Sequence, residues 1–137
     1  MDKKRILIVE DQTDARELFS LMLRRLGYDI SEAISGLEAI DQAIAARPEL
    51  IFMDLALPGI KGYEATARLK ANPATKDIPV IVLTAYHYEA EQVRLAIEAG
   101  AAEVYQKPIG LKTLKQISHR YLTLDKPSET KLALAPQ

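Results

Sequence analysis

Five chemically functional residues each follow a short apolar run of this sequence. They are Glu10 and Asp11 after the run 6–9, Asp54 after 50–53, Thr84 after 80–83, and Lys107 at the end of a fourth run. If the runs are parallel strands of one sheet, their carboxyl ends meet at one edge. The five side chains are then expected to converge at that edge.

Three of the five residues are acids, so their proximity needs an explanation. Each pair of like charges at roughly 4 Å costs about 4 kcal/mol at an effective dielectric constant of about 20. Mg2+ offsets such repulsion, because this hard cation prefers carboxylate, water and phosphate oxygens as ligands. Lys107 adds a compact cation and Thr84 a hydroxyl. With Mg2+, these groups could neutralise the oxygens of a phosphoryl group in transfer to Asp54.

Each of these residues taken alone has a purely structural explanation. Acids after a strand often lie at the start of a helix, where the helix dipole favours negative charge. Thr84 alone fits a strand-end hydroxyl or a helix cap, and Lys107 fits a surface charge beside a proline turn. The functional interpretation therefore depends on their joint placement.

Helical periodicity separates the apolar runs. Apolar residues at i, i+3 and i+4 predict a helix from Thr13 that Gly27 ends. Ser35 and Glu38 have the spacing of a capping box, which predicts a helix that runs to about Ala46. The other predicted helices span 62–71, 89–99 and 111–122.

Strands and helices thus alternate five times, which predicts an α/β fold. Such alternation requires right-handed crossovers and a parallel sheet with helices on both faces, a three-layer sandwich. The runs 6–9, 50–53 and 80–83 are continuously apolar and fit central strands. The run 28–33 alternates and the run 102–105 contains a charge, so these two fit the edges. The strand order that satisfies all five is 2-1-3-4-5.

Length, charge and cysteine content exclude several classes. The 137 residues predict one domain at 1–124 and a flexible tail at 125–137, without an output domain. A net charge of -1 with dispersed basic residues argues against nucleic-acid binding. The absence of cysteine excludes disulfides and thiolate metal ligands. The first apolar stretch is too short for a signal peptide or a membrane span, so the expected location is cytoplasmic.

The site motifs resemble the receiver domain of two-component response regulators, in its stand-alone form. The motifs are Glu10-Asp11, the segment 54–62, Thr84-Ala85 and Lys107-Pro108, and the resemblance covers residues 4 to about 123. It implies a flavodoxin-like fold with the strand order given above. It also implies a phosphorylation-dependent signalling switch rather than an enzyme with an external substrate.

The same resemblance implies a role for each site residue. Asp54 would accept a phosphoryl group from a sensor histidine kinase or a histidine phosphotransfer protein. The implied ligands of Mg2+ (or Mn2+) are Glu10, Asp11, Asp54 and the backbone carbonyl of Ala56. Thr84 and Lys107 would contact the phosphoryl oxygens. The implied output is contact with an unknown downstream protein, and a homodimer through the fourth helix, fifth strand and fifth helix is a further expectation.

One position departs from the family pattern. The aromatic residue on the fifth strand usually stands three residues before the lysine, where this chain has Val104, whereas Tyr105 stands two before. Because strand side chains alternate, Tyr105 should point away from the face that Val104 occupies. Either Val104 fills the aromatic position, or Tyr86 or Tyr88 supplies the bulk.

Two further expectations concern the phosphoryl group. Ala56 and Tyr86 would flank the path of an attacking water without a group to orient it, which predicts slow self-hydrolysis. On the first helix, Arg16, Ser20 and Arg24 are predicted to form an outward docking face for a helical phosphodonor.

Three other functions compete with this interpretation. A phosphatase of the haloacid dehalogenase type generally needs a second acid two residues after the aspartate, where this chain has Ala56. A flavodoxin would need a hydroxyl-rich phosphate loop at Glu10 and Asp11, whose charges repel a flavin phosphate. A degenerate receiver that serves only as a scaffold is the most serious rival, although all five site positions are intact.

Overall fold

The computed structural model describes residues 3–85 and 90–122, which form five strands and five helices in alternation. The strands are β1 (Arg5–Val9), β2 (Asp29–Ala33), β3 (Leu50–Asp54), β4 (Val80–Thr84) and β5 (Glu103–Gln106). The helices are α1 (Thr13–Arg25), α2 (Gly36–Ala46), α3 (Gly62–Ala71), α4 (Ala90–Glu98) and α5 (Leu111–Leu122). Among these described helices, none is long and apolar enough to cross a membrane.

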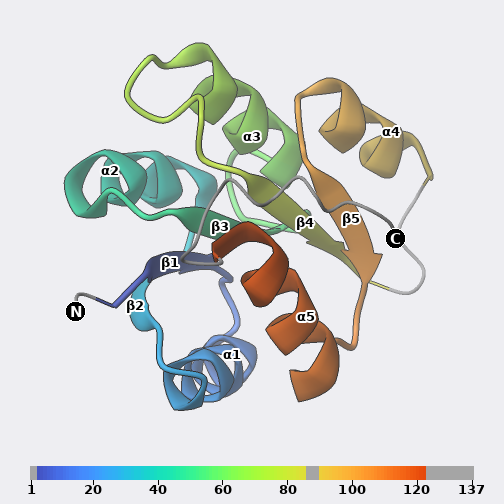
Figure 1. Cartoon of the computed structure of the whole chain (residues 1–137). Coiled ribbons are helices and arrows are strands. Elements are labelled where there is room, and N and C mark those ends of the chain that lie inside the picture. The colour runs from blue at the N-terminus through green and yellow to red at the C-terminus, as the bar shows by residue number, and fades with distance from the viewer. Residues whose placement is uncertain (1–2, 86–89, 123–137) are drawn as a thin grey trace, which may run out of the picture.

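The five strands form one parallel sheet in the order β2-β1-β3-β4-β5, which confirms the predicted fold class and strand order. The continuously apolar strands β1, β3 and β4 are central, and the two strands with polar residues lie at the edges. Helices α1 and α5 cover one face of the sheet, and α2, α3 and α4 cover the other (Figure 1). All five strands therefore end at the same edge.

Alternate residues of the central strands enter two separate cores, one on each face of the sheet. The strand residues on the side of α2, α3 and α4 are Leu7, Val9, Ile51, Met53, Val80 and Val82. Those on the side of α1 and α5 are Ile6, Ile8, Leu50, Phe52, Ile81 and Leu83. Burial of each such side chain contributes roughly 1.5–3 kcal/mol. The loops of the site thus extend from a sheet that is packed on both faces.

Helix α1 ends as its sequence predicts. Gly27 has a positive φ of 100°, a conformation that favours glycine. The Gly27 N–H donates to the carbonyl of Arg24, and the Tyr28 N–H donates to that of Leu23. These are the two hydrogen bonds of a Schellman motif, so the chain turns directly from α1 into β2.

The start of α2 differs slightly from the predicted capping box. The Ser35 hydroxyl accepts from the Glu38 N–H at 3.1 Å, as expected. The Glu38 carboxylate, however, accepts from the N–H of Ile34 rather than from that of Ser35. Both side chains still satisfy N–H groups at the helix start, so the predicted boundary holds although one partner shifts by a residue.

The strand ends lie one residue further along than the sequence suggests. Asp54 and Thr84 are the last residues of β3 and β4 rather than the first residues after them. The sheet itself, and not a loop, therefore holds these two side chains in position. The predicted start of the fourth helix at 89 and the predicted tail at 125–137 lie outside the described residues.

Candidate functional site

The carboxyl edge of the sheet brings the three predicted acids together. Glu10 and Asp11 follow β1, and Asp54 ends the neighbouring strand β3. Each of the three offers a carboxylate oxygen, and these oxygens all lie within 4.8 Å of one another. The predicted convergence of the acids is therefore present.

Burial differs sharply within this acidic cluster. Glu10 is 2% exposed and Asp54 is 6% exposed, whereas Asp11 is exposed to solvent. The cluster is thus a buried pair of carboxylates with a solvent-facing acid at its mouth. Such an arrangement leaves a path from solvent to Asp54.

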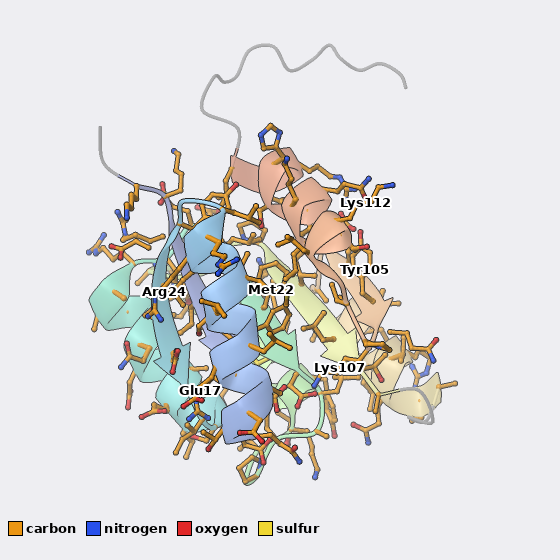
Figure 2. The ribbon with its side chains drawn as sticks, turned by 90° about the horizontal axis from the view of Figure 1, so that it is seen from below. Glu17, Met22, Arg24, Tyr105, Lys107 and Lys112 are labelled. Carbon is orange, nitrogen blue, oxygen red and sulfur yellow. The ribbon has the colours of Figure 1, made fainter. Side chains whose placement is uncertain are left out.

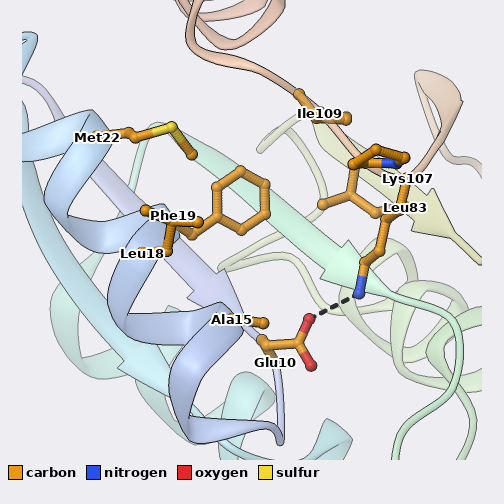
Figure 3. Close-up of a pocket in the computed structure, with 9 residues that line it drawn as sticks. Glu10, Ala15, Leu18, Phe19, Met22, Leu83, Lys107 and Ile109 are labelled. Carbon is orange, nitrogen blue, oxygen red and sulfur yellow. Dashed lines mark hydrogen bonds and ion pairs between the residues drawn. The ribbon is translucent and has the colours of Figure 1, made fainter.

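Lys107 places its ammonium group between the two buried acids. Its Nζ lies 2.8 Å from Glu10 Oε1 (Figure 3) and 3.5 Å from Asp54 Oδ2. Burial alone would lower the pKa of Lys107, but the hydrogen bond to Glu10 and the charges of both acids outweigh it and raise this pKa. Lys107 is therefore a firmly charged group at the site.

The negative charge of Asp54 is only partly compensated by Lys107. Burial raises the pKa of Asp54 to about 6, and the charge of Glu10 adds to the effect. Lys107 and a hydrogen bond from the Ala56 N–H to Asp54 Oδ1, at 3.3 Å, oppose it only in part. The site thus has an excess of negative charge.

Backbone hydrogen bonds align the remaining site residues with Asp54. The Leu55 N–H donates to the Leu83 carbonyl at 3.0 Å, and the Lys107 N–H donates to the Thr84 carbonyl at 2.8 Å. The hydroxyl of Thr84, a residue only 8% exposed, donates to the carbonyl of Ala85 at 3.3 Å. The carboxyl ends of β3, β4 and β5 therefore stand in a row that presents a carboxylate, a hydroxyl and an ammonium group.

The donor set of this edge fits Mg2+. Glu10, Asp11 and Asp54 offer hard oxygen ligands, which Mg2+ prefers, and no histidine or cysteine contributes to the described cluster. The raised pKa of Asp54 marks a charge that a divalent cation would stabilise. Ala56, whose carbonyl was predicted as a ligand, is exposed two residues beyond Asp54.

The loop after Asp54 returns tightly to the end of β3. The Gly62 N–H donates to the carbonyl of Leu55 at 3.1 Å. A Cβ atom on Gly62 would lie 2.3 Å from the carbonyl oxygen of Asp54 and 2.8 Å from the Cα of Leu55. The first residue of α3 thus packs directly on the backbone that carries the predicted phosphoacceptor.

An apolar pocket lies directly beside the acidic cluster, between α1 and the segment that joins β5 to α5 (Figure 3). Its lining residues are Glu10, Ala15, Leu18, Phe19, Met22, Leu83, Lys107, Pro108 and Ile109. Leu18, on the rim, is 58% exposed. A partner that reaches Asp54 from this side would meet an apolar surface.

The predicted docking face on α1 is wrong for two of its three residues. Ser20 is 1% exposed, and the Arg16 side chain is only 14% exposed, so neither is available to a partner. Arg24 does lie on the exposed side of the helix (Figure 2). The exposed side of α1 also includes Leu18 and Leu21, which gives this face a more apolar character than predicted.

Val104 and Tyr105 point to opposite faces of the sheet, as the strand alternation predicts. Val104 packs in the core beneath α2, α3 and α4, and Tyr105 packs with the core of α1 and α5. Tyr105 therefore cannot occupy the face that the family's aromatic residue uses. The alternative candidates Tyr86 and Tyr88 lie outside the described residues.

A hydrogen-bonded group that sequence reasoning missed ties β5 to α5. The Glu103 carboxylate accepts hydrogen bonds from the hydroxyls of Tyr105 and Tyr121 and from the guanidinium of Arg120. Burial alone would raise the pKa of Glu103, but these donors lower it below its usual range. Tyr105, which Figure 2 shows on the α5 side, is thereby fixed on that face.

The second missed group surrounds Glu32 on β2. Its two carboxylate oxygens accept hydrogen bonds from Arg16 and from Ser20 of α1, which explains why those two residues turn inward. The available clue in the sequence was the alternation of polar and apolar residues in the run 28–33, which includes Glu32. That alternation indicated an edge strand but not the partners of the Glu32 carboxylate.

Comparison with known proteins gives a consistent result. The sequence profile of the response regulator receiver domain matches residues 6–119. The chain is 33% identical over 124 residues to sporulation initiation phosphotransferase F of Bacillus subtilis, covering 90% of this chain and 98% of that protein. It is 37% identical over 120 residues to the polar-differentiation response regulator DivK of Brucella anthropi, covering 87% and 96%. The matched part of this chain spans about half the length of some other curated relatives.

Solved structures show the same fold. The receiver domain of the sensor histidine kinase PA1611 from Pseudomonas aeruginosa superposes with a TM-score of 0.80 at 31% sequence identity, covering 88% of this chain and 98% of that one. That structure holds a magnesium ion coordinated in its active site cleft.

Proposed function

This chain belongs to the family of response regulator receiver domains, and from that membership we propose that it is a phosphorylation-dependent switch of a two-component phosphorelay. Asp54 is the phosphoacceptor, and Mg2+ is the cofactor. The donor is a phosphohistidine on a sensor histidine kinase or on a histidine phosphotransfer protein. The output is a change in contact with another protein.

The convergence of three carboxylates around one lysine carries this proposal. The carboxylate oxygens lie within 4.8 Å of one another, and the pKa of Asp54 is raised to about 6 by burial and by Glu10. A buried cluster of like charges is unfavourable unless a ligand compensates it. Such a cluster is therefore expected at a binding site rather than in a purely structural edge of the sheet.

The proposed reaction is a transfer between two protein side chains. A carboxylate oxygen of Asp54 forms a bond to phosphorus, the bond from phosphorus to the histidine nitrogen breaks, and that nitrogen keeps the electron pair. Lys107, 3.5 Å from Asp54 Oδ2, and the hydroxyl of Thr84 are suited to bind the phosphoryl oxygens. Bound Mg2+ would neutralise further charge on these oxygens. Its proposed ligands are Glu10, Asp11, Asp54 and the carbonyl of Ala56.

The proposed donor approaches beside α1. The pocket between α1 and the β5–α5 segment opens next to Glu10 and Lys107, and the exposed Leu18 lines it. Leu21, also exposed on α1, adds apolar surface to the same helix. The downstream protein is unidentified, and a homodimer through α4, β5 and α5 remains a proposal, as does a cytoplasmic location. No nucleic acid or membrane is among the proposed partners.

Intact mass spectrometry tests the proposal. The protein is incubated with acetyl phosphate and Mg2+, and we expect a gain of one phosphoryl group. Asp54→Asn should show no gain, because the amide lacks a nucleophilic carboxylate. Chelation of Mg2+ should suppress the gain in the wild type. An equal gain in Asp54→Asn, or none in the wild type with Mg2+, would contradict the assignment.

The phosphorylated protein is expected to hydrolyse slowly, with a half-life of minutes or longer. Ala56 is exposed beside Asp54 and has no group that could orient an attacking water. Tyr86, the other predicted flanking residue, lies outside the described residues. Phosphate release from the isolated protein with Mg2+ measures this lifetime.

Substitution of Ala56 provides the comparison for that measurement. Ala56→Asn places a carboxamide near the path of the water and should shorten the half-life. The exposed position makes loss of stability small, and a thermal melt checks this. A half-life of only seconds in the wild type would refute slow hydrolysis.

A further inference from the structure

Arg16 of α1 binds the backbone of the acidic pair rather than its carboxylates. Its Nη1 lies 3.0 Å from the carbonyl oxygen of Glu10 and 3.5 Å from that of Asp11. The side chain is only 14% exposed, so the guanidinium is held between α1 and the loop that follows β1. One side chain thus contacts both carbonyl groups of the Glu10-Asp11 segment.

The guanidinium is itself held from the other side by β2. Arg16 Nε donates to Glu32 Oε1 at 3.2 Å, and the buried Ser20 hydroxyl donates to Glu32 Oε2 at 2.5 Å. The planar guanidinium presents its donors in a fixed geometry, which suits simultaneous contact with a carboxylate and a carbonyl. Arg16, Glu32 and Ser20 form a chain of contacts, here called the Arg16 brace, from β2 to the acidic segment.

The brace complements the backbone hydrogen bonds of Glu10. The Glu10 N–H donates to the carbonyl of Ala33 on the β2 side at 3.0 Å. With Arg16 bound to the Glu10 carbonyl, both peptide groups of this residue are fixed to neighbouring structure. The side chain is then free to project toward Lys107 and the other acids, as its 2.8 Å contact with Lys107 requires.

We propose that the Arg16 brace is a positioning element for Mg2+ binding: it holds the backbone of Glu10 and Asp11 so that their carboxylates are arranged for the cation before it arrives. This inference rests on the proposed function of the acidic cluster. Arg16 binds the carbonyls of Glu10 and Asp11, so it acts through the geometry of the loop. Partners that orient metal ligands in this way commonly affect metal affinity by about 10–100-fold.

The direction in which Mg2+ affinity changes when Arg16 is replaced distinguishes a positioning role from an effect of its charge alone. Arg16 is a cation near a cation site, so its removal by itself would strengthen Mg2+ binding through reduced repulsion. Positioning predicts the opposite, because a loop that is no longer held must be ordered when Mg2+ binds. Arg16→Lys keeps the charge but loses the planar fork, so a weaker affinity in this variant reports geometry alone.

Isothermal titration calorimetry with MgCl2 tests the proposal on four proteins: the wild type, Arg16→Lys, Arg16→Gln and Arg24→Gln. Arg24 is the matched control, since it lies on the same helix and is exposed, and its guanidinium donates to the Ile30 carbonyl at 3.5 Å, away from the acidic cluster. We expect the Mg2+ dissociation constant to rise about tenfold or more in both Arg16 variants. Arg24→Gln should leave it unchanged or slightly lower.

Three other results would overturn the inference. Affinities of the Arg16 variants equal to that of the wild type, or tighter, would show that the brace does not position the ligands, while the proposed function would stand. If the wild type itself binds no Mg2+, the proposed function and this inference both fail. Thermal melts in chelator check that each variant folds. If Arg16→Lys does not fold, Ser20→Ala decides instead, because it loosens Glu32 without any change in charge, and an unchanged affinity would overturn the inference.

Discussion

Replacement of Asp54 by asparagine is expected to raise the free energy of unfolding of the metal-free protein at neutral pH by roughly 1–3 kcal/mol. Burial and the charge of Glu10 raise the pKa of Asp54 to about 6, so the ionised carboxylate is disfavoured in the folded state. Asparagine has nearly the same shape and no charge. It removes the repulsion but retains an oxygen that can accept from the Ala56 N–H.

The effect of Asp54 on stability depends on pH in a defined direction. Its pKa is about 6 in the folded protein and near 3.8 in the unfolded chain, so the folded state binds the proton more tightly. The resulting stabilisation is fully present below the unfolded pKa and is lost as the pH rises through about 6. The advantage of Asp54→Asn should therefore be largest above this pH and should shrink toward pH 4.

Urea unfolding in chelator across this pH range measures the prediction. Asp11→Asn is the matched control, because Asp11 belongs to the same cluster but is exposed, and its substitution should have a much smaller effect. Added Mg2+ should reverse the order by stabilising the wild type more than Asp54→Asn. A lower stability of Asp54→Asn in chelator at neutral pH would contradict the clustered arrangement of charges.

Gly62→Ala is expected to lower the free energy of unfolding by about 3 kcal/mol or more. The new Cβ atom would lie 2.3 Å from the carbonyl oxygen of Asp54 and 2.8 Å from the Cα of Leu55. Both are backbone atoms, in the last residue of the central strand β3 and in the residue that follows it, and they cannot move without disturbing the end of that strand. The same displacement should shift Asp54, so phosphoryl uptake from acetyl phosphate should fall even where the variant is folded.

Two other glycines separate this steric effect from the general cost of replacing glycine. A Cβ on Gly110 would meet nothing within 4 Å, and Gly110 is not among the described glycines with positive φ, so Gly110→Ala should be nearly neutral. Gly59 also has open space but a φ of 75°, so Gly59→Ala should cost about 1–2 kcal/mol from backbone strain alone. Chemical denaturation should show the smallest loss of stability for Gly110→Ala, an intermediate loss for Gly59→Ala and the largest for Gly62→Ala. A neutral Gly62→Ala would disprove the close packing on Asp54.

The fold was predictable because the pattern of apolar and polar residues in each run indicated where that strand lies in the sheet. Continuous runs such as 50–53 had to be buried on both faces, and the alternating run 28–33 could only be an edge. Gly27 and Ser35 marked the ends of helices through backbone requirements that few residues meet. These are local properties, and local properties are what a single sequence records best.

The convergence of the acids was predictable for a different reason. Asp54 and its partners follow from topology alone, since parallel strands end at one edge whatever their side chains do. The choice of partners by long side chains was not predictable. Arg16 was expected to face solvent, yet Glu32 holds it inward, and nothing in the spacing of these two residues indicates their contact. The hydrogen bonds of Glu103 on β5 were missed for the same reason, because they too depend on contacts between long side chains.

The ion pair between Lys107 and Glu10 joins residues 97 positions apart. A chain still emerging from the ribosome, with β1 and β3 made but β5 absent, would hold Glu10 and Asp54 without this counter-charge. Arrival of β5 therefore brings the ammonium group that partly offsets the repulsion between these two buried carboxylates.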